Sequence, residues 1–114
     1  MKHTDFITVT KDELLSLNYD RNAEILRVLG HPIRIKILVG LTYGGCNVKN
    51  MVECLDLPQA TISQHLAILR NLGIIKGDRE GNQVIYQIKD DYIFNIINET
   101  IEDARQLEKE RKKA

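Results

Sequence analysis

The chain has 114 residues, of which 43% are hydrophobic and 28% charged, and its formal net charge is zero. This balance indicates one ordinary globular domain, and it excludes a disordered chain and a generic polyanion binder of the histone-like kind. No run approaches the roughly 18 consecutive apolar residues of a membrane span, and the first ten residues carry no apolar leader. Two cysteines are too few for a disulfide framework. We therefore expect a cytoplasmic protein with no membrane partner.

The first expected helix follows a short N-terminal segment, residues 1–9, which we expect to be flexible. Thr10 stands three residues before Glu13, which is the capping-box spacing, and an apolar run follows. The apolar pattern continues until Gly30, with a break expected around residues 18–20. The pattern therefore predicts a helical N-terminal region that is interrupted once.

Three further helices are expected in the first two thirds of the chain. Pro32 suits a first helical turn, where its missing N–H costs nothing, so a helix is expected from there to the pair Gly44-Gly45. A short helix should cover residues 47–55. Pro58 again suits a first turn, and Gly73 ends this next helix in the manner of a C′ glycine.

The chain then changes from a helical to an alternating period. Apolar residues alternate over 84–88 after a turn-rich stretch at 78–82, which predicts a two-stranded hairpin. A closing helix is expected over residues 92–112. The predicted fold is thus mainly α with a β-hairpin wing, in the order α-α-α-α-β-β-α, and forms one domain over residues 10–112. These are the elements of a winged helix-turn-helix.

The helix that begins near Pro58 has one apolar stripe and one small, amide-bearing face. Ile62, Leu66 and Leu69 follow the i, i+4, i+7 spacing of a buried stripe. The residues on or beside the opposite face are Ala60, Thr61, Ser63, Gln64, Ala67 and Asn71. Such a face suits a DNA major groove, because Gln and Asn bond adenine, Ser and Thr bond bases or phosphates, and Ala meets a thymine methyl. The alternative is a solvated face, although surface helices usually favour Lys and Glu.

One arginine, Arg79, lies in the predicted hairpin tip beside the sequence Gly81-Asn82. Arginine binds phosphate, so this side chain would position a duplex and carry little sequence information. The alternative is an ordinary solvated loop.

Three stretches together resemble the ArsR/SmtB family of bacterial and archaeal repressors: LGHPIRIKIL from Leu29, LPQATISQHLAILRNLGII from Leu57 and GDREGNQVIYQI from Gly77. The resemblance covers residues 22–104, and the second stretch is its most specific part. It implies a homodimer built on the first and last helices, with double-stranded operator DNA contacted by the fourth helix and the wing. By position, the family's base-contacting residues match Gln59, Ala60, Ser63 and Gln64.

The closing helix carries an apolar face at a spacing of four and three residues. A domain of this size covers little apolar surface by itself, so we expect this face to pair with a second copy. The predicted dimer residues are Ile93, Ile97, Ile101 and Ala104.

The family's metal sites are not matched in this chain. Its third-helix site needs Cys-x-Cys where this chain has Asn47-Val48-Lys49, and its last-helix site needs Asp and His, whereas the closing helix has no histidine. Zinc and similar ions favour imidazole or thiolate ligands. We therefore expect no metal site and no other cofactor.

His31, Cys46 and Cys54 are the remaining residues with reactive or ligating side chains. His31 belongs to the family's helix-start motif, which implies local capping or packing. Cys46 and Cys54 are eight residues apart on or beside one helix, so they would lie about 12 Å apart, too far for a disulfide. We interpret Cys54 as a buried small hydrophobe. Cys46 precedes a helix start, which would lower the thiol pKa, and is the candidate redox residue.

These observations predict a sequence-specific, double-stranded DNA-binding transcriptional regulator, a repressor that acts as a homodimer. Two alternatives remain: a dimeric protein-interaction module that has lost DNA binding, and a cysteine-based redox or persulfide-sensing repressor. An enzyme is not expected, because no nucleophile, base and orienting group share a plausible site.

Overall fold

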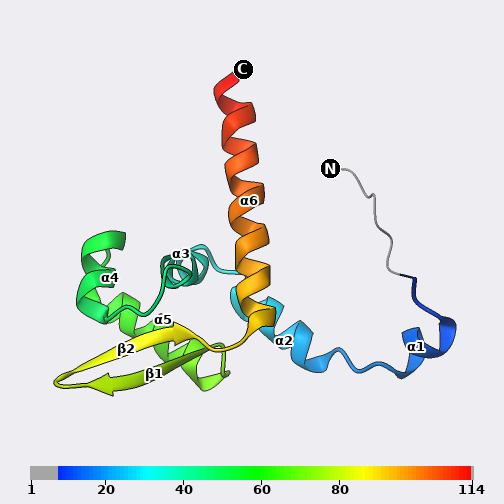
Figure 1. The fold of residues 1–114 in the computed structure, drawn as a ribbon, viewed down its shortest axis with the longest axis horizontal. Coiled ribbons are helices and arrows are strands. Elements are labelled where there is room, and N and C mark those ends of the chain that lie inside the picture. Colours follow the sequence, from blue (N-terminus) through cyan, green and yellow to red (C-terminus); the bar gives the residue numbers. More distant parts are fainter. Residues whose placement is uncertain (1–7, 114) are drawn as a thin grey trace.

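The computed structural model describes residues 8–113, and this range holds six helices and one two-stranded antiparallel sheet (Figure 1). The elements are α1 (Lys11–Ser16), α2 (Asp20–Leu29), α3 (Pro32–Leu41), α4 (Val48–Leu55), α5 (Gln59–Asn71), β1 (Ile75–Glu80), β2 (Gln83–Ile88) and α6 (Asp91–Lys113). The predicted fold class, helical with a hairpin wing before a closing helix, is confirmed. The segment 1–9 predicted to be flexible lies mostly outside the described residues.

The expected break in the N-terminal helix separates α1 from α2, so the chain has one helix more than the predicted order. The Thr10 hydroxyl accepts a hydrogen bond from the Glu13 N–H (3.1 Å) at the start of α1, as the capping-box spacing predicts. The Asn18 carboxamide oxygen accepts a bond from the Asp20 N–H (2.8 Å), which is a local turn in place of a continued helix. A side-chain cap therefore starts α1, and a local Asn18 turn leads into α2.

The core is formed by one side of each of α2, α3 and α5, together with Met51 of α4, the start of β1 and the first half of α6. Its buried residues are Ile25, Val28, Leu29, Ile37, Leu38, Leu41, Met51, Ile62, Leu66, Leu69, Ile74, Ile75, Ile93 and Ile97. The helical spacing noted in the sequence thus becomes one continuous apolar cluster.

Two of the residues predicted to pair with a second copy belong to this core. Ile93 and Ile97 are 0% and 1% exposed within the single subunit. These two side chains therefore stabilise the core of the single subunit, and their predicted part in a dimer interface stays a prediction. Ile101 is half-buried and Ala104 is exposed, so these two predicted residues still present surface.

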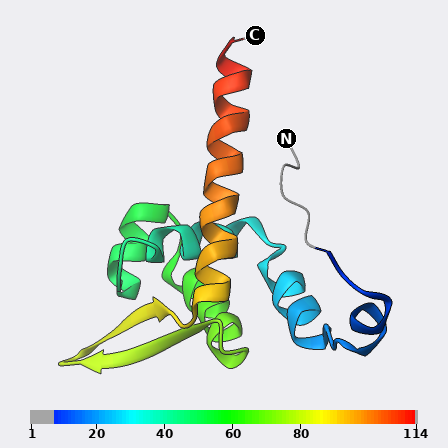
Figure 2. The ribbon, with the colours of Figure 1, turned by 45° about the vertical axis from the view of Figure 1, so that its right-hand side comes forward.

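The hairpin and α5 lie at the end of the molecule where α6 begins, and α6 projects away from them in both views (Figures 1 and 2). The helix α1 stands apart from the helical core, beyond the start of α2. The surface near α5 and the hairpin is therefore separated from the surface offered by α1 and the outer half of α6. Within residues 8–113 no helix is long and apolar enough to cross a membrane.

Candidate nucleic-acid interface

A tight turn joins α4 to α5. Asn47 caps α4 by accepting a bond from the Asn50 N–H (2.8 Å). Asp56 ends α4 in the left-handed region (φ 54°), with its N–H bonded to the Val52 carbonyl (3.0 Å). Pro58 then precedes the first residue of α5. These residues produce the helix-turn-helix that the sequence predicts.

The buried and exposed faces of α5 follow the predicted division. Ile62, Leu66 and Leu69 are buried in the core, whereas the opposite side is open to solvent. The exposed residues are Gln59, Ala60, Ser63, Gln64 and Ala67, and Thr61 is half-buried beside them. The predicted base-contacting residues therefore share one accessible surface, while their contact with DNA stays a prediction.

The first turn of α5 adds a favourable electrostatic feature to this surface. It contains no acidic side chain, and the one charged residue of the helix, Arg70, lies in its last turn. The unpaired N–H groups and the positive end of the helix dipole are thus not neutralised by the helix's own carboxylates. Such a terminus attracts phosphate groups.

The wing is fixed to the segment before α4. The Cys46 N–H donates to the Tyr86 carbonyl (3.1 Å), and the Tyr86 N–H donates to the Cys46 carbonyl (2.8 Å). The Asn47 amide also donates to the Gln83 side-chain oxygen. A Cβ on Gly45 would lie 2.4 Å from Ile85 Cγ2, so this close approach requires glycine. The wing and α4 are therefore held in one relative position.

Sequence reasoning missed this anchor. The pair Gly44-Gly45 served there as a helix-end signal, but α3 already ends at Leu41. Gly45, Asn47 and Tyr86 act together only because a distant strand passes beside them. The alternation of β2 gave no sign of a third strand-like partner.

Arg79 is exposed on β1 and lies opposite Val84. The predicted turn over 78–82 is too wide, because the strands run up to Glu80 and resume at Gln83. Gly81 adopts φ 64°, which allows a two-residue turn with Asn82. Arg79 thus projects from a regular strand rather than from a loose loop.

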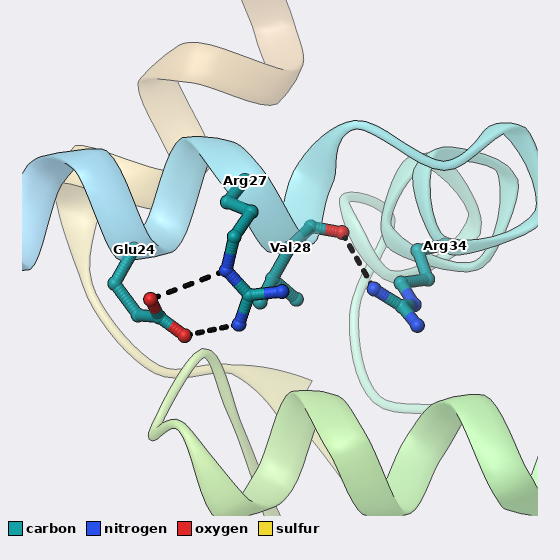
Figure 3. Close-up of polar contacts among 4 residues, drawn as sticks. All are labelled: Glu24, Arg27, Val28 and Arg34. Atoms are coloured by element: carbon teal, nitrogen blue, oxygen red, sulfur yellow. Dashed lines mark hydrogen bonds and ion pairs between the residues drawn. The ribbon is translucent and has the colours of Figure 1, made fainter.

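A polar cluster behind α5 connects it to α2 and α3. Arg34 donates to the Val28 carbonyl (3.2 Å), as Figure 3 shows, and also to His65 Nδ1 on α5 (3.2 Å). The His31 and His65 rings lie 4.6 Å apart. His31 Nδ1 accepts a bond from the Ile33 N–H (3.2 Å), so the predicted capping role of His31 is confirmed. In the same view Glu24 and Arg27 pair with each other on α2.

This cluster favours a neutral His65. Burial lowers the pKa of His65, and the charges of His31 and Arg34 act in the same direction. A neutral ring keeps Nδ1 available as the acceptor for Arg34. Sequence reasoning did not identify the contact between Arg34 and His65, because it joins residues on two different helices.

The structure corrects both cysteine interpretations. Cys54 is exposed rather than buried. Burial raises the pKa of the Cys46 thiol, and the nearby Cys54 adds to this effect. The expected lowering is absent because burial has the larger effect on the Cys46 pKa, and because Asn47, not Cys46, caps α4. Cys46 is half-buried in the wing anchor, which makes it a less reactive thiol than predicted.

Within residues 8–113 no three His, Cys, Asp or Glu side chains are grouped closely enough to hold a metal ion. That no metal acts on this protein stays a prediction.

Comparison with known proteins identifies the family. The model of the bacterial regulatory protein, arsR family, matches residues 31–76, from the α3 cap to the start of β1. The transcriptional repressor PagR of Bacillus anthracis is 38% identical over 88 residues, which cover 76% of this chain and 86% of PagR. The chain belongs to the ArsR family. This is a family of transcriptional regulators and not of enzymes, as predicted.

Two further relatives extend the comparison. The HTH-type transcriptional repressor SmtB of Mycobacterium tuberculosis is 35% identical over 85 residues, which cover 75% of this chain. The chain spans 63% of the length of that relative. The crystal structure titled "predicted DNA-binding transcriptional regulator from E. coli" has a TM-score of 0.73 at 27% identity, covering 83% of this chain and 99% of that one. The winged helix-turn-helix is thus shared in structure as well as in sequence.

Proposed function

We propose that this ArsR-family protein is a sequence-specific transcriptional repressor that binds double-stranded operator DNA as a homodimer. The observation that carries the proposal is the exposed face of α5. Gln59, Ser63 and Gln64 lie on this face, and the wing is anchored close to the same helix-turn-helix. A helix with such residues can enter a major groove while a neighbouring hairpin contacts the backbone.

The side chains divide into two roles. The Gln64 amide can donate to and accept from an adenine edge, which would give sequence discrimination. Arg79, on the exposed strand of the wing, suits a phosphate and would strengthen binding to any sequence. Repression is supported by the similarity to PagR and SmtB, which are transcriptional repressors.

The homodimer is supported by apolar surface that one subunit leaves uncovered. Leu14, Leu15 and Leu26 are exposed on α1 and α2, and Leu107 is exposed on the projecting part of α6. Several large apolar side chains left exposed on the N-terminal and closing helices favour an interface on these helices. In both ribbon views α1 and the projecting part of α6 stand apart from α5 and the wing, so a dimer through them would leave both DNA-contacting elements free (Figures 1 and 2).

The test compares two variants on an operator obtained by selection from random duplexes. Gln64→Ala should lose about 1–3 kcal/mol of discrimination at particular base pairs, measured by fluorescence anisotropy with single-base changes. Arg79→Ala should weaken binding to all DNA sequences alike. It should also reduce the slope of log affinity against log salt concentration by about one. Gln106→Ala, the same truncation on projecting α6, is the control and should bind as wild type. Unchanged sequence preference in Gln64→Ala would refute the role of α5.

A further inference from the structure

Arg34 joins three helices through two side-chain hydrogen bonds. It lies on α3, and its Nη1 donates to the Val28 carbonyl in the last turn of α2 (3.2 Å), while its Nε donates to His65 Nδ1 on α5 (3.2 Å). Carbonyls in a last helical turn have no partner within their own helix, so the first bond satisfies one of them. Arg34 and His65 are both half-buried. One side chain therefore connects α2 and α3 to the helix that carries the proposed base-contacting face.

The bond to His65 restrains α5 in a way that its apolar contacts do not. Ile62, Leu66 and Leu69 bury one side of the helix, but burial of apolar surface has no directional preference. A hydrogen bond is directional and weakens steeply when its donor and acceptor lose alignment. A rotation of α5 by about 10° would move a side chain such as Gln64, about 6 Å from the helix axis, by about 1 Å. Such a displacement is enough to break a hydrogen bond to a base.

This bond requires a neutral His65. A neutral ring can accept at Nδ1, whereas a protonated ring has donors at both nitrogens and faces the Arg34 guanidinium with the same charge. Burial lowers the pKa of His65, and the charges of His31 and Arg34 act in the same direction. The His31 ring lies 4.6 Å from that of His65, and the one charged side chain of α5, Arg70, lies in its last turn. Protonation of His65 would thus place positive charge beside positive charge.

Within residues 8–113 no carboxylate is bonded to His31, Arg34 or His65. On α2, Glu24 pairs with Arg27, as Figure 3 shows, and is not bonded to Arg34. No hydrogen bond or ion pair joins a charged side chain of α4 or β1 to His65 within the same range. The repulsion that follows protonation is therefore not offset by a neighbouring acid, and the Arg34 bond is the contact that gives way.

We propose that Arg34 and His65 are positioning residues for operator binding, and that protonation of His65 releases α5 from Arg34 and weakens sequence-specific binding in mildly acidic conditions. The proposal rests on the proposed function, because it concerns how α5 is presented to DNA. Its sign is distinctive: a protonated histidine adds positive charge, which ordinarily strengthens binding to DNA phosphates. Weaker binding on acidification points to a displaced helix.

Operator affinity is measured by fluorescence anisotropy at about pH 7.5 and about pH 5.5, at constant ionic strength. The pKa of His65 lies below 6.5, so the wild type should lose roughly 2- to 10-fold in affinity, and the protonated fraction sets the upper limit. His65→Asn places an amide oxygen near the position of Nδ1 and cannot be protonated, so its affinity should change less than about 2-fold. His3→Asn, the same change in the remaining histidine, is the control and should keep the wild-type loss.

Variants of α3 test the positioning role at constant pH. Arg34→Gln removes both bonds and should reduce the discrimination between the operator and its single-base variants. It should also remove the loss of affinity on acidification. Lys36→Gln removes the same charge from an exposed position of the same helix and should keep both properties. Circular dichroism at each pH gives the folded fraction, so that affinities are compared for folded protein.

NMR spectroscopy of the free protein tests the release of α5 without DNA. The ¹⁵N signals of the Arg34 Nε–H and of the Gln64 backbone amide should shift together as the His65 ring titrates. In His65→Asn neither signal should shift over the same pH range. Signals that stay unchanged while the wild-type His65 ring titrates would overturn the proposed release.

The outcomes separate this inference from the proposed function. Sequence-specific binding that does not weaken on acidification, or weakens only with the folded fraction, would overturn the positioning role and leave the function standing. An equal loss in His65→Asn would also overturn it. A wild type that binds no duplex at about pH 7.5 would overturn the proposed function and with it the role in operator binding, while the NMR titration would still report on the Arg34–His65 bond.

Discussion

Gly45→Ala is the substitution for which the structure gives the sharpest expectation. The added Cβ would lie 2.4 Å from Ile85 Cγ2, closer than real Cβ contacts allow, and 3.4 Å from Gln87 Cγ. Ile85 is β-branched and stiff at χ1, so the strand must move rather than the side chain alone. Overpacking of this kind costs about 1–3 kcal/mol. Because Cys46 follows directly, the displacement should also strain its two bonds to Tyr86.

The assay is urea unfolding followed by operator binding. Gly45→Ala should lower the free energy of unfolding by about 1–3 kcal/mol and should weaken DNA binding further, because the wing loses its fixed position. Gly40→Ala is the matched control: its added Cβ meets nothing within 4 Å, and in α3 it should stabilise by about 0.5–1 kcal/mol. A Gly45→Ala protein as stable as wild type, with unchanged operator affinity, would show that the wing is not anchored through this contact.

Two further predictions concern the support behind α5. Lowering the pH from about 7.5 to about 5.5 should destabilise the fold, because the pKa of His65 lies below its ordinary value of 6.5 and the unfolded chain therefore takes up the proton first. The stabilisation from the neutral His65 ring is complete above pH 6.5 and is lost as the pH falls further. The urea midpoint of His65→Gln should therefore depend less steeply on pH than that of wild type. Equal slopes in the two proteins would contradict this prediction. Leu69→Ala should lower the free energy of unfolding by about 2–5 kcal/mol, because Leu69 is 0% exposed. Leu72 is exposed, so Leu72→Ala should change it by less than about 1 kcal/mol in the same assay. Equal losses in the two leucine variants would mean that Leu69 does not support the helix as described.

The elements that sequence reasoning predicted well are those that depend on near neighbours along the chain. Thr10 and Glu13 cap α1 across three residues, and His31 caps α3 across two. The buried stripe of α5 follows from helical spacing alone, which also places Gln64 on the opposite, exposed face. Each of these features is decided within one or two helical turns, so the sequence contains the necessary information.

The features that were missed join distant segments. The wing anchor pairs Cys46 with Tyr86 across forty positions of sequence, and the Arg34–His65 bond joins α3 to α5. No periodicity specifies such contacts, because each requires the tertiary arrangement first. The cysteine interpretation failed for the same reason: the thiol pKa depends on what covers Cys46 and on which residue caps α4, and both are set by the packed structure.

The closing helix shows what a periodic pattern predicts and what it does not. The spacing of Ile93, Ile97 and Ile101 correctly indicates one apolar face, but it cannot say which surface covers that face. In the structure the first two lie under the subunit's own helices, and coverage ends near Ile101, where a groove between α6 and α3 opens. The face is thus divided along its length: its inner half stabilises the fold of the subunit, and its outer half is surface that the proposed homodimer could bury.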